Sequence, residues 1–401
     1  MKKMVKIKDS VNEGKFTIID VIFLVIIFSL LSIAITTFIF KKKRIAVANN
    51  DIDKVYNQII NNYYEEVDKD ELSKSAIDGM MNYLGEKYSI YLDKDSTNQL
   101  NNELDGKYKG IGIIAVQNKD GIFVDDVMKN SPADSAGLQP GDKITYYSGN
   151  KIDSNTKLIE LLDYIKENDE VALTIKRNDS DILINLRTTD IDNPVVSSKL
   201  LTSDNDNYGY IYLESFTGAS SIQFKNALDE LEKNDLKGLI IDLRTNKGGY
   251  LEQSHAIASM FVRKGKILYS IKDRNTDDIK YDDTDEHREY PVVVLVNSMT
   301  ASASELLAIS LKESYGAILV GTTTYGKGKI QQTSNIGDSS MIKYTTATWY
   351  SPNHNNIDGQ GIRPSYTVKL SRAYIKNPID KNDDQLKKGL SVLVGLSKWI
   401  K

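Results

Sequence analysis

Apolar residues form four successive patterns along this chain, and the first is an uncharged run from Val21 to Phe40. A tetrabasic block at 41–44 ends the run. Because a helix rises about 1.5 Å per residue, a run of this length spans the roughly 30 Å hydrocarbon core of a bilayer. A buried core helix would instead carry a polar stripe, which this run lacks. We therefore expect a transmembrane helix at 21–40, preceded by a cytoplasmic N-terminus at 1–20.

Retention of this segment as a membrane anchor is a second expectation. The small residues at 46–48 are similar to a signal-peptide cleavage site, but the tetrabasic block separates them from the apolar run. Cleaved signal cores are also shorter than this run. Lysines flank the run on both sides, so the positive-inside rule does not decide which side of the membrane carries the rest of the chain.

Two further patterns follow the basic block. At 50–100, apolar residues recur at spacings of three and four, as at Ile52, Val55 and Ile59, which predicts an N-terminal helical segment. At 101–188, β-branched runs alternate with turns that contain glycine or proline. This second pattern predicts a small, mostly β domain.

The fourth pattern, at 189–370, alternates short apolar runs with helical periodicity. Buried strands are expected at 208–213, 238–243, 291–297 and 317–320, and helices at 222–231, 253–261 and 303–314. The alternation predicts an α/β core that contains parallel strands. The charged tail at 371–401 is expected to hold one amphipathic helix after Asp383.

Composition narrows the function classes. The 401 residues carry a formal net charge of −4, and 26% of them are charged, as in ordinary folded proteins. Because there is no basic excess, nucleic acid is not an expected partner. Cysteine is absent, which excludes disulfides, a thiol nucleophile and a thiolate metal site.

Ser302 is the first candidate for chemistry. It stands where a predicted buried strand meets a predicted helix, and Ser302 and Glu305 have the S-x-x-E spacing of a capping box. Helix capping alone would explain this spacing. A serine on a strand-to-helix turn can also act as a nucleophile, because backbone amides there point at a developing oxyanion.

Lys327, which stands between two glycines, is the candidate base for such a nucleophile. A lysine acts as a base only when burial or a nearby cation lowers its pKa, and flanking glycines allow a turn to press it into a closed site. A solvated loop lysine is the alternative. Of the three histidines, His287 and His354 lie in hydrophilic stretches, and His255 fits a structural helix position better than a catalytic one.

Two nucleotide-binding motifs are imitated in the sequence. The stretch 321–327 matches the start of a P-loop, but Gly328 replaces the Ser or Thr that would bind magnesium. The stretch 330–350 then reads as strands, whereas a P-loop leads into a helix. The run 110–115 resembles a dinucleotide fingerprint, but it too leads into a strand. A P-loop nucleotide-binding protein is therefore a minor alternative.

The turn at 242–249 follows another predicted buried strand and ends in Gly248 and Gly249. Paired glycines let backbone amides approach a ligand closely. A tight strand-to-helix turn alone would also explain them. Both interpretations can hold, because such a turn is one way for backbone donors to reach an oxyanion.

The Ser-Ala-Ser-Glu, Gly-Lys-Gly and paired-glycine motifs, together with Gly-Ile-Gly-Ile at 110–113, resemble the C-terminal processing peptidases, or tail-specific proteases. The similarity spans roughly 50–393. It implies an α/β fold, namely a crotonase-like (ClpP/crotonase type) serine protease core at 189–370 with an inserted PDZ domain at 101–188. The N-terminal helical segment and the C-terminal helical tail also fit the family's order.

The resemblance also assigns roles to single residues. It implies that Ser302 is the nucleophile, that Lys327 is the general base, and that Gln331 orients the lysine. The backbone amides of Ala303 and Gly248 correspond to the family's oxyanion hole. In the PDZ domain, a turn would present amides to a peptide's C-terminal carboxylate while the peptide adds a strand. The residues of that turn are Gly110, Ile111, Gly112 and Ile113.

The expected function is that of a membrane-anchored serine endopeptidase that captures C-terminal tails of protein substrates through its PDZ domain and cleaves them with a Ser-Lys dyad. The resemblance implies protein or peptide substrates and no cofactor or metal. It places the PDZ and peptidase domains outside the cytoplasm on a single-pass anchor in the cell membrane, and it allows a homodimer. In some relatives a PDZ arginine couples ligand binding to catalysis, a role for which Arg177 is a candidate. The alternative from another class is a catalytically silent, membrane-anchored PDZ adaptor.

Overall fold

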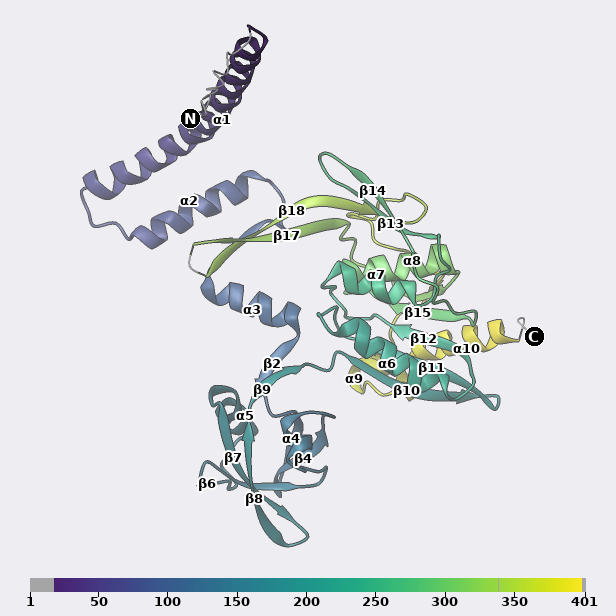
Figure 1. Cartoon of the computed structure of the whole chain (residues 1–401). Helices are drawn as coiled ribbons and strands as arrows, with labels where there is room; N and C mark the ends of the chain where they lie inside the picture. Colours follow the sequence, from purple (N-terminus) through teal and green to yellow (C-terminus); the bar gives the residue numbers. More distant parts are fainter. Residues whose placement is uncertain (1–17, 338, 399–401) are drawn as a thin grey trace, which may run out of the picture. The chain divides into compact units, whose positions relative to one another are not determined.

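The computed structural model describes residues 18–337 and 339–398 (Figure 1). Contacts between residues divide the chain into two compact units, with the boundary between Gly85 and Glu86. The first unit contains two helices, α1 (Ile18–Asn62) and α2 (Lys69–Tyr83). The side chain of Asp68 caps α2 by accepting hydrogen bonds from the first backbone amides of that helix.

The transmembrane prediction at 21–40 is not supported by the structure. Helix α1 continues through the basic block at 41–44 and ends at Asn62. In the part of the chain that the structure describes, no helix combines the length and the apolar character needed to cross a membrane. Most of the predicted cytoplasmic N-terminus, 1–17, lies outside the described residues.

A six-stranded antiparallel sheet and two helices, the longer of which is α5 (Leu158–Glu167), form a small β domain in the second unit. The elements of this domain are β3 (Ile113–Asn118), β4 (Gly121–Val127), α4 (Pro132–Ser135), β5 (Lys143–Tyr147), β6 (Asn150–Lys151), β7 (Glu170–Arg177) and β8 (Ser180–Arg187). Alternate residues of β7 are buried, namely Val171, Leu173 and Ile175, and they pack with Leu161 of α5. Strand β3 is at one edge of the sheet. A separate ladder of β2 (Lys107–Gly110) and β9 (Thr189–Asp192) connects this domain to the rest of the unit.

The larger domain is built on a six-stranded sheet. In spatial order its strands are β10 (Val196–Ser203), β11 (Asp206–Leu213), β12 (Leu236–Asp242), β15 (Val292–Val296), β16 (Ile318–Gly321) and β19 (Tyr366–Thr367). Strand β10 is antiparallel to β11, and the remaining neighbours are parallel. The apolar β15 and the apolar run 239–241 of β12 are buried on both faces, as expected of parallel strands covered by helices.

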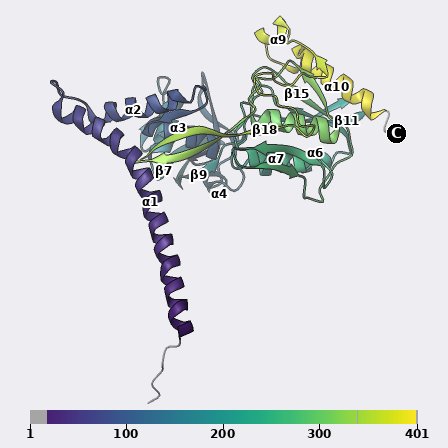
Figure 2. The same ribbon diagram turned by 90° about the horizontal axis from the view of Figure 1, so that it is seen from above.

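Helices cover both faces of this sheet, as Figure 2 shows. One face packs against α6 (Ser220–Glu232), α7 (Leu251–Ser259) and α8 (Ala303–Ser310), and the other packs against α10 (Asp384–Ser397). The alternation of side chains along β12 explains this sorting, because Leu239 and Ile241 face the first group of helices while Ile240 faces α10. Asp242 is in phase with Ile240 and therefore lies on the α10 face.

A second, five-stranded antiparallel sheet extends beside the larger domain. Its strands are β1 (Ile90–Leu92), β13 (Ile267–Lys272), β14 (Asp277–Tyr281), β17 (Lys329–Ile336) and β18 (Ser340–Tyr350). Strand β18 pairs with β1, β13 and β17. The remaining helical pieces are α3 (Lys94–Asp105), α9 (Arg372–Lys376), a π-helical turn at Leu311–Tyr315 and a 3₁₀ turn at Asp380–Asn382.

The predicted elements of the α/β core are confirmed. Each of the four expected buried strands and the three expected helices has a counterpart within a few residues, and α10 follows Asp383 as expected. The predicted helical segment at 50–100 is correct only in part, because β1 interrupts it. A strand follows Lys327, so the helix that a P-loop requires is missing and the nucleotide-binding alternative is wrong on this point.

Candidate active site

Ser302 ends the turn that joins β15 to α8, which we call the serine turn (297–302). Its backbone has φ 59° and ψ −121°. Residues other than glycine rarely adopt such a conformation, which costs on the order of 1–3 kcal/mol. Ser302 and Glu305 also occupy the N-cap and N3 positions of a capping box. Because a strained serine on a strand-to-helix turn exposes its hydroxyl, the capping and nucleophile interpretations are compatible.

Glu305 joins the serine turn to the loop that carries Lys327, which we call the lysine loop (322–328). The Glu305 side chain is fully buried. Its Oε2 accepts hydrogen bonds from the backbone amides of Ser302, at 2.9 Å, and Lys327, at 2.8 Å. Its Oε1 accepts from the amide of Gly326, at 2.7 Å, and from the hydroxyl of Thr324. One carboxylate therefore holds the backbones of both candidate catalytic residues.

The side chain of Lys327 is held by two groups. Its Nζ donates a hydrogen bond of 2.6 Å to Oε1 of Gln331 and lies 4.9 Å from the centre of the Tyr88 ring. The amide of Gln331 donates to the Tyr88 carbonyl oxygen. Among the described residues, no hydrogen bond joins Lys327 Nζ to the Ser302 hydroxyl. The structure therefore brings Lys327 and Gln331 together and leaves the contact with Ser302 unmade.

Burial lowers the pKa of Lys327 below its ordinary value, and the nearby charge of Lys343 lowers it further. The carboxylates of Glu86 and Glu305 act in the opposite direction. Lys343 lies on β18, and burial lowers its pKa as well. The environment of Lys327 therefore favours the neutral amine, which is the form that can act as a base.

Gly248 packs directly against the serine turn. It belongs to the loop after β12, which we call the glycine turn (245–249), and a Cβ at Gly248 would lie only 2.9 Å from the Cβ of Ser302 and 3.1 Å from the amide nitrogen of Ala303. Its φ of 101° also favours glycine. The amide of Gly248 donates to Oδ1 of Asn246, at 2.9 Å. The amide of the predicted oxyanion donor is thus engaged within its own turn.

Asn246 connects the two turns. It is fully buried, and its carbonyl oxygen accepts hydrogen bonds from the amide of Ala301 and the hydroxyl of Ser304, both at 3.0 Å. Its side-chain amide donates to the carbonyl of Leu213, at 2.9 Å. The glycine turn is therefore tied to residues on both sides of Ser302 in the sequence.

These groups line one cavity of about 1620 Å³. The cavity is bounded by α3, the glycine turn and the β17–β18 hairpin. Its lining includes the predicted residues Ser302, Lys327, Gln331 and Gly248, and also Lys343. A cavity of this size accommodates an extended peptide segment rather than a small molecule. None of the three histidines, all within the described residues, lines it.

The predicted carboxylate-binding turn at 110–113 lies where β2 ends and β3 begins. Gly112 has φ 81°, and a Cβ there would lie 2.2 Å from the Cβ of Ser131, so only glycine fits. Ile111 and Ile113 are buried in the domain core. In this domain β3 has a free edge, and α5 packs beside it.

Exposed apolar side chains lie on β3, which forms this free edge, and on α5, which packs beside it. On β3 they are Ile114 and Val116, and on α5 they are Ile159 and Leu162. The side chain of Gln117 fixes the start of α5 by accepting a hydrogen bond of 2.9 Å from the Leu158 amide. The free edge and the apolar side chains on α5 form the type of surface to which an extended, apolar peptide adds as a strand.

Arg177 does not have the free side chain that a coupling role would require. It forms a bidentate ion pair with Asp142, with distances of 2.7 Å for both nitrogen–oxygen contacts, and also donates to the carbonyl of Gly137, at 2.8 Å. All three residues belong to the small β domain. The structure therefore shows Arg177 as a stabiliser of a turn in its own domain.

Sequence reasoning missed Tyr88, Lys343 and the second role of Glu305. Tyr88 precedes β1 and reaches Lys327 and Gln331 only because β1 pairs with β18. No motif marks it. The Glu305 carboxylate was predicted as part of a helix cap, and nothing in the local sequence indicates that its oxygens also bind the lysine loop.

Comparison with known proteins gives consistent results along the chain. The model for peptidase family S41 matches residues 207–368, the model for the PDZ domain matches 110–188, and the model for the activating protease CtpB N-terminal domain matches 39–96. The carboxy-terminal processing protease CtpB of Bacillus subtilis is 34% identical over 364 residues, which cover 87% of this chain and 75% of that protein.

Other proteins show the same similarity. A Staphylococcus aureus N315 protein assigned as a CtpA-like serine protease is 34% identical over 384 residues, covering 90% of this chain and 76% of its own length. A crystal structure of a Bacteroides fragilis protein assigned as an S41 protease superposes with a TM-score of 0.50 at 16% identity, over 83% of this chain and 91% of that chain. This last likeness concerns the fold alone.

Proposed function

This chain belongs to peptidase family S41, the carboxy-terminal processing serine proteases with a PDZ domain, and we propose that Ser302 and Lys327 form its nucleophile and base. The observation that carries the proposal is the shared support of the two residues. Glu305 binds both of their backbone amides, and both side chains line the same cavity. Ser302 also has the strained backbone typical of an exposed nucleophile.

In the proposed reaction, Ser302 Oγ attacks the carbonyl carbon of the scissile peptide bond and its proton passes to Nζ of neutral Lys327. The new carbon–oxygen bond produces a tetrahedral oxyanion. When the carbon–nitrogen bond breaks, Lys327 returns the proton to the leaving amine. Water then attacks the acyl ester, again losing its proton to Lys327, and Ser302 is regenerated.

Gln331 orients the lysine in this scheme. Its Oε1 accepts a hydrogen bond of 2.6 Å from Lys327 Nζ, so the nitrogen is held at one side of the cavity. A lysine has rotatable bonds that allow Nζ to reach Ser302 once substrate is bound, and catalytic hydrogen bonds often tighten only then. The missing contact between Ser302 and Lys327 is thus compatible with a ligand-free resting geometry.

Backbone amides of Ala303 and Gly248 stabilise the oxyanion in our proposal. Ala303 begins α8, where the helix dipole also favours negative charge. One such donor is typically worth on the order of 3 kcal/mol in the transition state. Gly248 must release Asn246 Oδ1 to donate to substrate, or the adjacent Gly249 amide must take its place.

We further propose that the small β domain binds the C-terminal tail of the substrate. The turn Gly110-Ile111-Gly112-Ile113 presents amides to the terminal carboxylate, the tail extends along the free edge of β3, and its apolar side chains contact α5. A crotonase-like arrangement of the larger domain belongs to the same proposal, supported by a mostly parallel sheet with helices on both faces. An extracytoplasmic location is also proposed, and protease accessibility in intact cells would test it.

The decisive experiment compares Ser302→Ala and Lys327→Ala with the unaltered protein on an internally quenched peptide that ends in valine. We expect both variants to lose at least about 10⁴-fold in kcat, as removal of a catalytic-triad serine or base does. Peptide binding, measured by fluorescence anisotropy, should stay the same. Turnover by the folded Ser302→Ala protein at the wild-type rate would remove Ser302 from the mechanism.

A further inference from the structure

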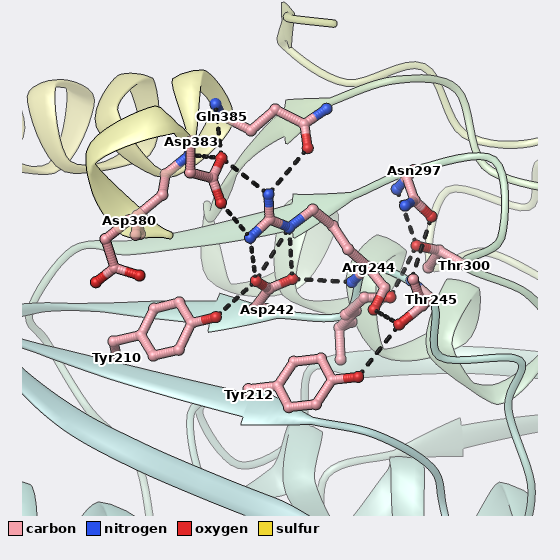
Figure 3. A network of polar contacts seen from close by, with 12 residues as sticks. Tyr210, Tyr212, Asp242, Arg244, Thr245, Asn297, Thr300, Asp380, Asp383 and Gln385 are labelled. Atoms are coloured by element: carbon pink, nitrogen blue, oxygen red, sulfur yellow. Dashed lines mark hydrogen bonds and ion pairs between the residues drawn. The ribbon is translucent and has the colours of Figure 1, made fainter. Parts of the chain in front are cut away.

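A buried cluster of charges lies behind the glycine turn, at the contact between β12 and the C-terminal segment (Figure 3). Its centre is Arg244, whose side chain is 8% exposed, and its two carboxylates, Asp242 and Asp383, are 2% and 3% exposed. Arg244 and Asp242 belong to the strand end and the following loop, whereas Asp383 caps α10. The cluster thus joins segments that are far apart in the sequence.

Every nitrogen of the Arg244 guanidinium has a partner in this cluster. Nε donates to both oxygens of Asp242, at 2.9 and 3.0 Å, and Nη2 contacts Oδ2 of Asp242, at 2.5 Å, and Oδ2 of Asp383, at 2.8 Å. Nη1 donates to Oδ1 of Asp383, at 3.0 Å, and to Oε1 of Gln385, at 3.1 Å. The planar guanidinium is therefore fixed in both position and orientation.

The second carboxylate of the cluster is also satisfied. Oδ1 of Asp383 accepts hydrogen bonds from the backbone amides of Gln385 and Leu386, at 3.0 and 2.9 Å, which are the first amides of α10. An anion at a helix N-terminus is favoured by the helix dipole. On the other side, the hydroxyl of Tyr210 donates to Asp242, at 2.7 Å. The cluster therefore holds two carboxylates and one guanidinium without an unpaired charge.

The same contacts continue into the glycine turn and the serine turn. Thr245, next to Arg244, has φ 67°, which is unfavourable for a β-branched residue, so its position depends on its surroundings. Its amide donates to Oδ1 of Asn297, at 3.3 Å, and its hydroxyl donates to the Arg244 carbonyl. Asn297 begins the serine turn, where its amide donates to Thr300 Oγ1, at 2.9 Å. Figure 3 shows this continuous path from Asp383 to Thr300.

We propose that Asp383 and Gln385 are positioning residues, which act through Arg244 to hold the glycine turn at the distance from Ser302 that an oxyanion donor requires. The inference depends on the proposed function of the glycine turn. It assigns to the C-terminal segment a part in transition-state stabilisation. A buried ion pair contributes little net stability when it is compared with apolar packing, so positional control is a better explanation of this cluster than stability alone.

Asp383→Asn is the variant that isolates this role. Asparagine is as good an N-cap as aspartate and keeps an oxygen for the amides of α10, so the helix should stay capped. The variant removes the charge and the acceptor for Nη2 of Arg244. The matched control is Asp384→Asn, the same substitution at the next residue, whose partly exposed carboxylate pairs with Lys387 rather than with Arg244.

The measurements are kcat and KM for the peptide ending in valine, and the affinity for a peptide aldehyde with the same sequence on its acyl side. The aldehyde forms a hemiacetal whose oxygen occupies the oxyanion position. We expect Asp383→Asn to lower kcat about tenfold or more with KM within twofold, because a displacement near 1 Å can cost about 10²-fold. Aldehyde affinity should fall in proportion to kcat/KM. Asp384→Asn should leave both unchanged.

Two results would overturn the inference. One is a folded Asp383→Asn protein, checked by circular dichroism, with wild-type kcat and wild-type aldehyde affinity. The other is a lower melting temperature accompanied by unchanged kcat well below that temperature, which would show a purely structural role. If Asp383→Asn does not fold, Gln385→Met removes one hydrogen bond to Arg244 and should lower kcat severalfold, and an unchanged kcat would again refute the proposal.

The experiment also separates this inference from the proposed function. If Ser302→Ala is inactive and Asp383→Asn is fully active, the dyad stands and only the positioning role fails. If Ser302→Ala retains wild-type activity, the oxyanion role of the glycine turn fails together with the dyad, whatever Asp383→Asn does.

Discussion

Glu305→Gln should damage the site far more than its small chemical change suggests. In the structure each oxygen of the Glu305 carboxylate accepts two hydrogen bonds, and the carboxylate itself is fully buried. Glutamine has one acceptor oxygen and one amide group that is itself a donor. With that amide group in place of Oε2, the backbone amides of Ser302 and Lys327 both face a donor. In the other orientation only the Gly326 amide does, because the Thr324 hydroxyl can rotate to accept.

The magnitude follows from this count. Leaving one buried donor unsatisfied costs about 1–3 kcal/mol, so one or two cost roughly 1–6 kcal/mol. Such a loss is large relative to a total stability of about 5–15 kcal/mol. If the fold persists, the lysine loop and the serine turn must separate to relieve the clash, and a shift near 1 Å can lower kcat/KM about 10²-fold.

The assay combines thermal unfolding with the pH dependence of kcat/KM on the peptide ending in valine. Because the negative charge of Glu305 raises the pKa of Lys327, its removal should lower that pKa. Activity depends on the neutral amine, so the limb on which kcat/KM rises with pH should move to lower pH while the plateau falls.

Glu160→Gln is the matched control, since Glu160 is exposed in the first turn of α5 and the same substitution there should change stability by no more than about 0.5 kcal/mol. A Glu305→Gln protein with the melting temperature and the kcat/KM of the unaltered chain would refute the role assigned to Glu305.

Substitutions at three further positions test other parts of the site. Lys343→Met should raise the pKa of Lys327 and move the rising limb of the kcat/KM profile to higher pH, whereas Lys343→Arg should leave the limb in place. Gln331→Leu should lower kcat about 10- to 100-fold with little change in KM, because Lys327 loses the acceptor that orients it, and equal kcat would contradict that role. Ile159→Asp should raise KM about tenfold for a protein with an apolar C-terminal tail and leave the cleavage of a short peptide without one unchanged, as steady-state kinetics on both substrates would show.

The sequence was sufficient to predict the α/β core because the residue pattern of its buried strands is recognisable without knowledge of the rest of the fold. Residues 238–241 and 292–296 are apolar throughout, as parallel strands covered on both faces must be, and the helices between them show regular amphipathic spacing. The long uncharged run at 21–40 carried an equally clear signal, yet the structure does not support its interpretation as a membrane span. The local residue pattern thus predicted the secondary structure well, and it predicted less well the environment that surrounds an element, such as a membrane.

The site was predictable where its residues lie in short motifs and not where the fold alone brings them together. Ser302, Lys327 and Gln331 could be named because their types and spacing match a family pattern. Tyr88 and Gln331 are 243 positions apart in the sequence, and Arg244 and Asp383 are 139 positions apart. No local sequence pattern indicates that either pair is in contact. Such contacts depend on strand pairing and helix packing, which single-sequence patterns do not specify.

With Lys327 as the proposed base and Gly248 as a proposed oxyanion donor, two hydrogen bonds of this structure must be exchanged before catalysis, which leads to a last prediction. Lys327 Nζ donates to Gln331 and the Gly248 amide donates to Asn246, so the base and one oxyanion donor are both satisfied internally. A typical hydrogen bond contributes about 1 kcal/mol net, so substrate contacts are sufficient to drive both exchanges.

A fluorophosphonate probe, which reacts with the Ser302 hydroxyl and places an oxygen at the oxyanion position, should therefore label the free protein slowly. A non-cleavable peptide that ends in valine and binds only the small β domain should leave that slow rate unchanged if the exchange is local to the cavity. A peptide that fills the cavity itself should block labelling. The free protein could instead be labelled rapidly, at the rate that a substrate-activated serine protease shows. That result would mean that both exchanges occur without substrate and that these two hydrogen bonds do not restrain the site.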